Sequence, residues 1–260
     1  MGIGQEWQNY RTKINDKLAI FSVNLELLEQ FLIVNHICEI VVQFDVPYIP
    51  DHQGLPQMES YASLQQDLLK ISTLISAQNN VYYAGNILCN GKATLYFYCN
   101  DALDITDILD DNFPQAVNIE KQFDSTWDLY FDFLMASSAD LKVNETEELL
   151  TNLIKDGKDV SKSYQIEHIF YFFQENDLYL FLEHVSASDI SFVSLKHSPN
   201  LISVDGYDRV YIAKIEQDLY LNDTSIYQYI RMFDELALLY SGEYVGWDSE
   251  DIGINKSQLN

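Results

Sequence analysis

Residues 155–168, Lys-Asp-Gly-Lys-Asp-Val-Ser-Lys-Ser-Tyr-Gln-Ile-Glu-His, mark the change from a helix to a strand. Apolar residues upstream recur at the spacing of one buried helix face, which predicts a helix over Glu145–Ile154 with Asn144 as its N-cap. Gly157 then supplies the left-handed residue that closes a helix. The run Tyr164–Phe173 is rich in Tyr, Ile and Phe, which is typical of a strand. The elements on either side can be placed from this turn.

The rest of the second half predicts an α+β order. Alternating side chains indicate a strand at Thr126–Met135, and a polar turn at 175–177 precedes a returning strand at Leu178–His184. Ser188–Lys196 is compatible with a short helix or a loop. A further strand at Val210–Glu216 and a long helix at Asp223–Tyr240 complete the order, which is the ferredoxin-like plan with one helix appended.

The first half predicts a related order after an extra pair of strands. Three strands are expected first, at Trp7–Tyr10, Leu18–Leu25 and Ile37–Val46, followed by a helix opened by Pro56 and running to Ser76. A hairpin of two further strands and a short helix at Asp101–Asp110 come next. We therefore expect two tandem ferredoxin-like α/β sandwiches with antiparallel sheets. Their expected extents are residues 1–115 and 121–250, with a boundary between Asn112 and Asp124 and a C-terminal tail at 251–260.

A hairpin is the strongest local prediction in the first half. Asn90-Gly91 joins the runs Val81–Cys89 and Lys92–Cys99, and such a dipeptide favours a two-residue type I′ turn. This turn pairs Cys89 with Lys92 and Cys99 with Tyr82. The two cysteines then lie at opposite ends of the hairpin, too far apart for a disulfide.

Composition limits the classes of function. The chain has 15 Lys and Arg against 40 Asp and Glu, a net charge of −25, with −10 over residues 1–120 and −15 over residues 121–260. Direct binding to nucleic acid or to an anionic membrane needs a basic surface and is disfavoured, whereas a basic protein partner is compatible. The three cysteines form no metal or secretory framework, and no apolar run is long enough to span a bilayer, so we expect a cytoplasmic protein.

Two motifs in the second half resemble the regulator of ribonuclease E activity B (RraB) family. The first is the Asp-Gly-x-Asp turn at residues 156–159, followed by Tyr-x-Ile-Glu-His at 164–168. The second is Gly242-Glu-Tyr-Val-Gly-Trp-Asp248, which resembles the family's Glu-Tyr-Asp-Gly-Trp but has Val245 in place of Asp. The resemblance covers roughly residues 125–250. It implies a non-catalytic regulator, since members of that family bind an endoribonuclease and inhibit it.

The first half resembles an uncharacterised domain family that occurs beside RraB-like domains in some bacterial proteins. The resemblance covers residues 5–110 and is carried by scattered structural residues: Trp7, Tyr10, Gly54-Leu55-Pro56, Glu59, Tyr83-Ala84-Gly85, Gly91 and Tyr96-Phe97-Tyr98. It implies no agreed activity.

No cluster of residues indicates catalysis, a cofactor or a metal. Asp124, Asp128 and Asp132 share a face of the expected strand, but carboxylates four residues apart on a strand diverge and are expected to be solvated. Glu167 and His168 could form a general base with its orienting acid, yet neighbouring strand residues point to opposite faces, which favours a packed, hydrogen-bonded histidine.

Two functional hypotheses follow. The first is an acidic regulatory protein that binds another protein, an endoribonuclease or its basic segment, with Tyr244 and Trp247 as anchors and the acidic helix around Glu145, Glu147 and Glu148 as the steering surface. The opposing interpretation of the two aromatic residues is that they fold back onto their own domain. The second hypothesis is a small-ligand-binding or enzymatic module with its site between the two domains.

Overall fold

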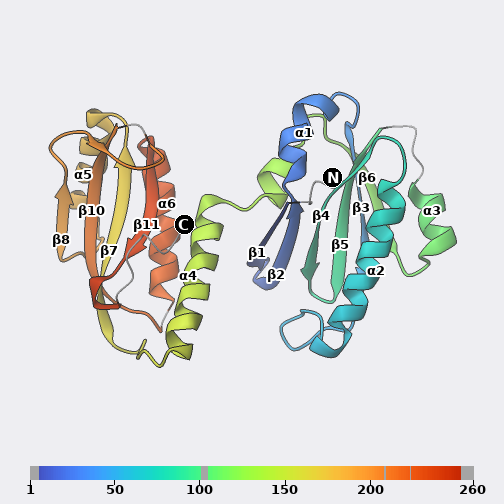
Figure 1. Ribbon diagram of the computed structural model, residues 1–260, viewed down its shortest axis with the longest axis horizontal. Coiled ribbons are helices and arrows are strands. Elements are labelled where there is room, and N and C mark those ends of the chain that lie inside the picture. The colour runs from blue at the N-terminus through green and yellow to red at the C-terminus, as the bar shows by residue number, and fades with distance from the viewer. Residues whose placement is uncertain (1–5, 101–104, 208, 223, 253–260) are drawn as a thin grey trace. The chain divides into compact units, whose positions relative to one another are not determined.

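The computed structural model of the chain divides into two compact units, residues 1–136 and 137–260 (Figure 1). The structure describes residues 6–100, 105–207, 209–222 and 224–252. Each unit is an α+β domain with its own antiparallel sheet. Among the described residues, no helix is both long and apolar enough to cross a membrane.

The first unit is a six-stranded sheet with the order β1-β2-β4-β5-β3-β6. Its elements are β1 (Trp7–Ile14), β2 (Lys17–Asn24), α1 (Glu26–Val34), β3 (Ile40–Pro47), α2 (Met58–Ser76), β4 (Val81–Cys89), β5 (Lys92–Cys99), α3 (Ile105–Asn112), β6 (Val117–Phe123) and a π-helix, η1 (Leu129–Leu134). The segment from β3 to β6 has the ferredoxin-like order of strands and helices. The expected extra strand pair is the hairpin β1–β2, which extends this sheet beyond β4.

Both faces of this sheet are covered. Helices α2 and α3 pack on one face, where Leu68, Ile71 and Leu109 join the core (Figure 1). Helix α1 and η1 contribute Leu27 and Tyr130 to the core on the other face. The two faces therefore bury separate clusters of side chains, and the strands between them are apolar on both sides.

The Asn90-Gly91 turn is confirmed. Asn90 and Gly91 have φ of 49° and 82°, as a type I′ turn requires, and Cys89 pairs with Lys92. The expected pairing of Cys99 with Tyr82 is wrong by one residue, because a bulge near Gly85 makes Val81 the partner of Cys99. All three cysteines are free thiols.

The segment from 113 to 136 differs most from expectation. Residues expected to link the domains form β6, which pairs with β3, so the first unit ends at Ala136 and not before Asp124. The strand predicted at Thr126–Met135 is wrong, since this segment turns at Trp127 (φ 58°) and continues as the π-helix. The Asp124 carboxylate stabilises the turn by accepting from the backbone N–H groups of Asp128 (2.9 Å) and Leu129 (3.1 Å).

Three helices of the first unit differ from expectation. Helix α1 was not predicted at all. Helix α2 begins at Met58, and Pro56 lies before it in a bridge with Pro50. For the short helix expected at Asp101–Asp110, residues 101–104 lie outside the described residues, and the helix extends to Asn112.

The second unit has the strand order β11-β7-β10-β8, the ferredoxin-like arrangement. Its elements are α4 (Ser138–Lys155), β7 (Ser163–Phe172), α5 (Glu175–Ala187), β8 (Ser194–His197), β9 (Ile202–Ser203), β10 (Arg209–Tyr220), α6 (Ser225–Leu239), β11 (Gly242–Asp248) and a 3-10 helix, η2 (Glu250–Ile252). Helices α4, α5 and α6 contribute to one core on one face of the sheet. Of the expected tail at 251–260, residues 253–260 lie outside the described residues.

The ferredoxin-like fold class is confirmed in this unit. Its first strand, however, is β7 and not the predicted strand at Thr126–Met135. Helix α4 begins at Ser138, about two turns before Glu145, and its N-cap is Ser137, whose hydroxyl accepts from the Asp140 N–H at 3.0 Å. The strand predicted at Leu178–His184 is wrong, because this segment belongs to α5. Gly157 does close α4 with φ 75°, as expected.

Candidate functional site

Residues 164–168 of the first RraB-like motif lie on β7, and the second motif forms the adjacent strand β11. In their register Trp247 is opposite His168, and Tyr244 is opposite Phe170. The Nδ1 atom of His168 lies 2.8 Å from the Tyr244 hydroxyl. Motifs that are about 75 residues apart in the sequence therefore form one hydrogen-bonded cluster inside the second unit.

This cluster is core and not surface. Tyr244 is 1% exposed and Trp247 is 5% exposed, so the prediction that they are exposed anchors for a partner is wrong. Both side chains instead fold back onto their own domain, as the opposing interpretation held. A register shift between Tyr244 and Gly246 inserts Val245 as an extra residue, which places Tyr244 and Trp247 on the same face. Val245 packs on the opposite face, against the small cluster of Ile169, Tyr171 and Val210.

Gly242 is needed for packing and not to close α6. A Cβ atom at this position would lie 2.3 Å from the Phe172 ring, so no larger residue fits there without moving that ring. The left-handed residue after α6 is Ser241, with φ 52°. Gly242 is instead the first residue of β11 and lies opposite Phe172.

His168 is a buried, neutral side chain. Burial lowers its pKa to about 3, and Gln217 opposes part of this shift. Neither His168 Nε2 nor Gln217 Oε1 has a hydrogen-bond partner within the described residues. Burial also raises the pKa of Tyr244, so the His168–Tyr244 hydrogen bond joins two uncharged groups. Glu167 points to the other face of the sheet, where Lys214 pairs with it at 2.5 Å. Glu167 and His168 therefore do not form a catalytic pair.

Helix α4 is fastened to its neighbours along its inner side. The indole Nε1 of Trp247 donates to Thr146 Oγ1 at 2.9 Å. Two ion pairs join α4 to α6, Lys142 to Asp234 at 3.1 Å and Arg231 to Asp140 at 2.9 Å. These contacts fix the position of α4 and orient its opposite side toward solvent.

The three acidic residues predicted as a steering surface are all exposed on α4. Glu145 and Glu148 are three residues apart and lie one turn from each other on one side of the helix. Glu147 lies on the flank toward α6, where its charge contributes to raising the pKa of Tyr227 after the larger effect of burial. Within the described residues none of the three forms an ion pair, so their charges are not neutralised by the protein itself.

A family model described as "Family of unknown function (DUF695)" matches residues 5–135. The chain belongs to this family. A second model, "Regulator of ribonuclease activity B", matches residues 143–249, so the C-terminal half is RraB-like. The two matches agree in order and extent with the two units, which we call the DUF695 unit and the RraB-like unit.

No curated protein matches the chain. The crystal structure of an unknown protein from Galdieria sulphuraria is 12% identical, with a TM-score of 0.22 over 80% of this chain and 95% of that one.

Asp124, Asp128 and Asp132 do not share a strand face as expected. In the DUF695 unit the Asp124 carboxylate accepts from the Tyr98 hydroxyl at 2.5 Å and caps the turn into η1, while Asp128 and Asp132 belong to a helical segment and not to a strand face. Across the part of the chain that the structure describes, no group of three or more His, Cys, Asp or Glu residues is placed to hold a metal ion.

Two groups of residues were not singled out from the sequence. Lys142 and Asp234 of the RraB-like unit are 92 residues apart, and only their helices' packing brings them together. The DUF695 unit contains a cavity of about 730 Å³ whose lining comes from β1, β2, β4 and α2. The sequence signal that could have indicated it is Gly85, whose position inside an apolar strand is typical of a bulge.

Proposed function

We propose that this protein is a non-catalytic regulator that binds a ribonuclease through the exposed side of α4 in its RraB-like unit. The observation that carries the proposal is the match of residues 143–249 to the regulator of ribonuclease activity B family. The pairing of both sequence motifs in the core supports a stable domain of that kind. The proposal concerns binding to a protein, because the family's described role is to regulate a ribonuclease.

The charge of α4 defines the kind of partner. Three carboxylates without an intramolecular ion pair attract a basic segment, and complementary charge speeds the encounter and makes it depend on salt. The chain's net charge of −25 repels RNA, so the protein meets the nuclease and not its substrate. We therefore place the partner surface in a Lys- or Arg-rich segment of the nuclease.

An apolar contact is available beside these charges. Ile154 is 58% exposed and lies two turns after Glu147 on the same flank of α4. An exposed isoleucine beside carboxylates can pack on the aliphatic stems of Lys and Arg. Ile154, and not the buried Tyr244 or Trp247, is therefore the apolar contact with the partner.

The test is the affinity of the full chain for purified ribonuclease E, measured at 0.15 M and 0.5 M salt. A variant with Glu145→Gln, Glu147→Gln and Glu148→Gln is compared with a control that removes three exposed charges elsewhere in the unit, Glu175→Gln, Glu183→Gln and Asp189→Asn. Exposed charge pairs contribute about 0.2–1 kcal/mol each, so the α4 variant should bind about tenfold more weakly at 0.15 M salt.

The control should bind like the wild type, and the difference between wild type and α4 variant should shrink at 0.5 M salt. Equal losses in the two variants would show that only total charge matters. Undetectable binding by the wild type, or binding of RNA alone at 0.15 M salt, would contradict the proposed function.

A further inference from the structure

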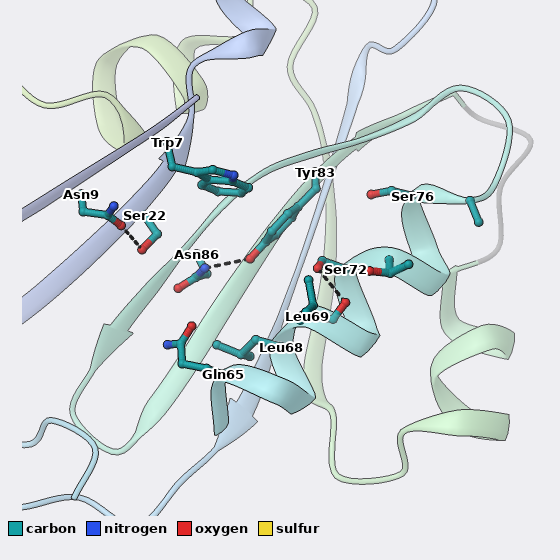
Figure 2. A pocket seen from close by; sticks show the side chains of 12 residues that line it. Trp7, Asn9, Ser22, Gln65, Leu68, Leu69, Ser72, Ser76, Tyr83 and Asn86 are labelled. Carbon is teal, nitrogen blue, oxygen red and sulfur yellow. Dashed lines mark hydrogen bonds between the residues drawn. The ribbon is translucent and has the colours of Figure 1, made fainter. Parts of the chain in front are cut away.

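The cavity of the DUF695 unit is an open groove between the sheet and α2 (Figure 2). Its volume is about 730 Å³. One wall is formed by the strands and the other by α2; the lining residues used below are Trp7, Asn9, Ser22, Tyr83 and Asn86 from the strands, with Gln65, Leu68 and Ser76 from the helix.

The groove exists because the sheet is wider than the helices that cover it. In a ferredoxin-like core, two helices cover four strands, and here the hairpin β1–β2 adds two strands beside β4. One row of paired residues across the sheet changes from polar to apolar: Asn9 pairs with Ser22, Ser22 with Asn86, and Asn86 with Leu95. The apolar end of this row belongs to the core under α2, and the polar end forms the floor of the groove.

A bulge in β4 directs two side chains into the groove. Tyr83 and Asn86 are three residues apart, so a regular strand would place them on opposite faces. The register shift between Tyr83 and Gly85 pairs Tyr83 with Phe97 and Asn86 with Leu95, both on the α2 face. The bulge requires glycine, because Gly85 has φ 154° and an added Cβ would lie 2.4 Å from the Ser22 carbonyl oxygen.

Aromatic rings form one end of the groove. Tyr83 stacks on Phe97 with ring centres 4.8 Å apart, and the Trp7 ring lies over Tyr83 at 5.5 Å (Figure 2). Trp7 is partly exposed, whereas Trp127 and Trp247 are buried. The indole of Trp7 is thus held by packing on one side and leaves part of its surface available to a ligand.

Polar groups on the floor are held in place and still have unused hydrogen-bonding atoms. The Ser22 hydroxyl donates to Asn9 Oδ1 at 2.7 Å, and Asn86 Nδ2 donates to the Tyr83 hydroxyl at 2.8 Å. Within the described residues, Asn9 Nδ2, Asn86 Oδ1 and the amide of Gln65 have no hydrogen-bond partner. These atoms offer both donors and acceptors, and the fixed geometry of the asparagines reduces the entropy lost on binding.

The lining has no charge. None of the twelve lining residues is acidic or basic, although the chain carries 55 charged residues in 260. A phosphate or carboxylate group would find no cation in the groove, and an ammonium group would find no anion. The ligand class is therefore uncharged, with several hydrogen-bonding groups and one apolar face.

We infer that the groove binds a neutral saccharide, with a sugar-ring face packed on Trp7 and hydroxyl groups bonded to Asn9, Asn86 and Gln65. Hydroxyls distributed around a ring match amides and hydroxyls distributed over two walls. A flat heterocycle would be held best between two parallel rings, but none of the lining residues that α2 contributes is aromatic. This site is independent of the partner surface proposed on α4.

The test uses the full chain and four neutral disaccharides, maltose, sucrose, lactose and trehalose, each titrated to 10 mM. The readouts are the indole N–H resonance of Trp7, assigned with a Trp7→Phe variant, and protection of Trp7 fluorescence from acrylamide. Glucose 6-phosphate and adenosine serve as a charged sugar and an uncharged heterocycle. We expect at least one disaccharide to bind with a Kd below 10 mM, and neither comparator to bind as tightly.

Two exposed positions on α2 provide variants that should leave the fold intact, so binding can be tested even if strand variants fail to fold. Gln65 lines the groove, whereas its exposed neighbour Gln66 does not. Gln65→Ala should weaken binding about threefold to tenfold, as loss of one hydrogen bond implies, and Gln66→Ala should leave it unchanged. Absence of any Trp7 response to all four disaccharides at 10 mM, equal losses in the two variants, or tighter binding of adenosine or glucose 6-phosphate would overturn the inference.

Discussion

His168 makes the stability of the RraB-like unit depend on pH in a defined direction. Its side chain is fully buried, and its pKa is lowered from 6.5 to about 3. Between these values the unfolded chain binds a proton that the folded chain does not, so acid favours unfolding. The free energy of unfolding is therefore unaffected by His168 titration above pH 6.5 and decreases as pH falls from 6.5 toward 3. Between pH 7.5 and pH 5 the unit should lose about 2 kcal/mol.

A substitution isolates this effect from the other titrating groups. His168→Asn keeps an acceptor near the position of Nδ1 for the Tyr244 hydroxyl and removes the titration. The variant should be less stable at every pH because it leaves a cavity, but its free energy of unfolding should change by about 2 kcal/mol less than that of the wild type between pH 7.5 and pH 5.

The assay is urea unfolding of the full chain, monitored by hydrogen exchange of peptides from β7. These peptides report on the RraB-like unit alone. Intrinsic exchange rates are corrected for pH. If wild type and variant lose equal stability between the two pH values, His168 is not held neutral in the folded state and the argument from its burial fails.

Three further outcomes follow from the packing. Trp247→Ala should destabilise the RraB-like unit by about 3–5 kcal/mol in urea unfolding, since it removes a buried indole; a folded variant of wild-type stability would show that the ring is exposed. Gly85→Ala should lower the free energy of unfolding by more than about 2 kcal/mol, because the added Cβ would meet the Ser22 carbonyl oxygen. Gly206→Ala, at a positive φ but in open space, should lower it by less, and equal losses in the two variants would contradict the close approach at the bulge. Alkylation of native protein at pH 8 should modify Cys89 first, because burial raises the pKa of Cys38 to about 11 and Cys99 is buried; mass spectrometry that found a Cys89–Cys99 disulfide would overturn the hairpin register.

Local signals in the sequence were sufficient for the hairpin and for the order of most elements. Strands β4 and β5 have the predicted bounds, because a type I′ turn with alternating strands is decided by neighbouring residues. The ferredoxin-like plan was also predictable, even with elements misassigned. The α+β class was correct although two predicted strands, Thr126–Met135 and Leu178–His184, are helical.

Elements whose pattern is ambiguous were predicted wrongly for identifiable reasons. Large side chains at 127–135 alternate with polar ones as in a strand, but the caps from Asp124 turn the chain into η1. In α5 the buried residues Leu178, Phe181 and Val185 have helical spacing, which the exposed Tyr179 and Leu180 between them obscured.

The candidate sites depend on features that no local pattern shows. The exposure of Glu145, Glu147 and Glu148 follows from helix periodicity and could be predicted. The burial of Tyr244 and Trp247 could not, because the inserted Val245 reverses the face of every later residue in β11. A second bulge, at Gly85, likewise creates the groove floor of the DUF695 unit.

The central claim is that the protein regulates a ribonuclease through α4. The most direct measurement is the rate at which purified ribonuclease E cleaves a fluorogenic RNA with increasing full-length protein at 0.15 M salt. We expect the rate to fall by more than half at saturation, and the Glu145→Gln, Glu147→Gln, Glu148→Gln variant to need about tenfold more protein for the same effect. A cleavage rate unchanged by folded wild-type protein, or lowered equally by wild type and variant, would contradict the claim.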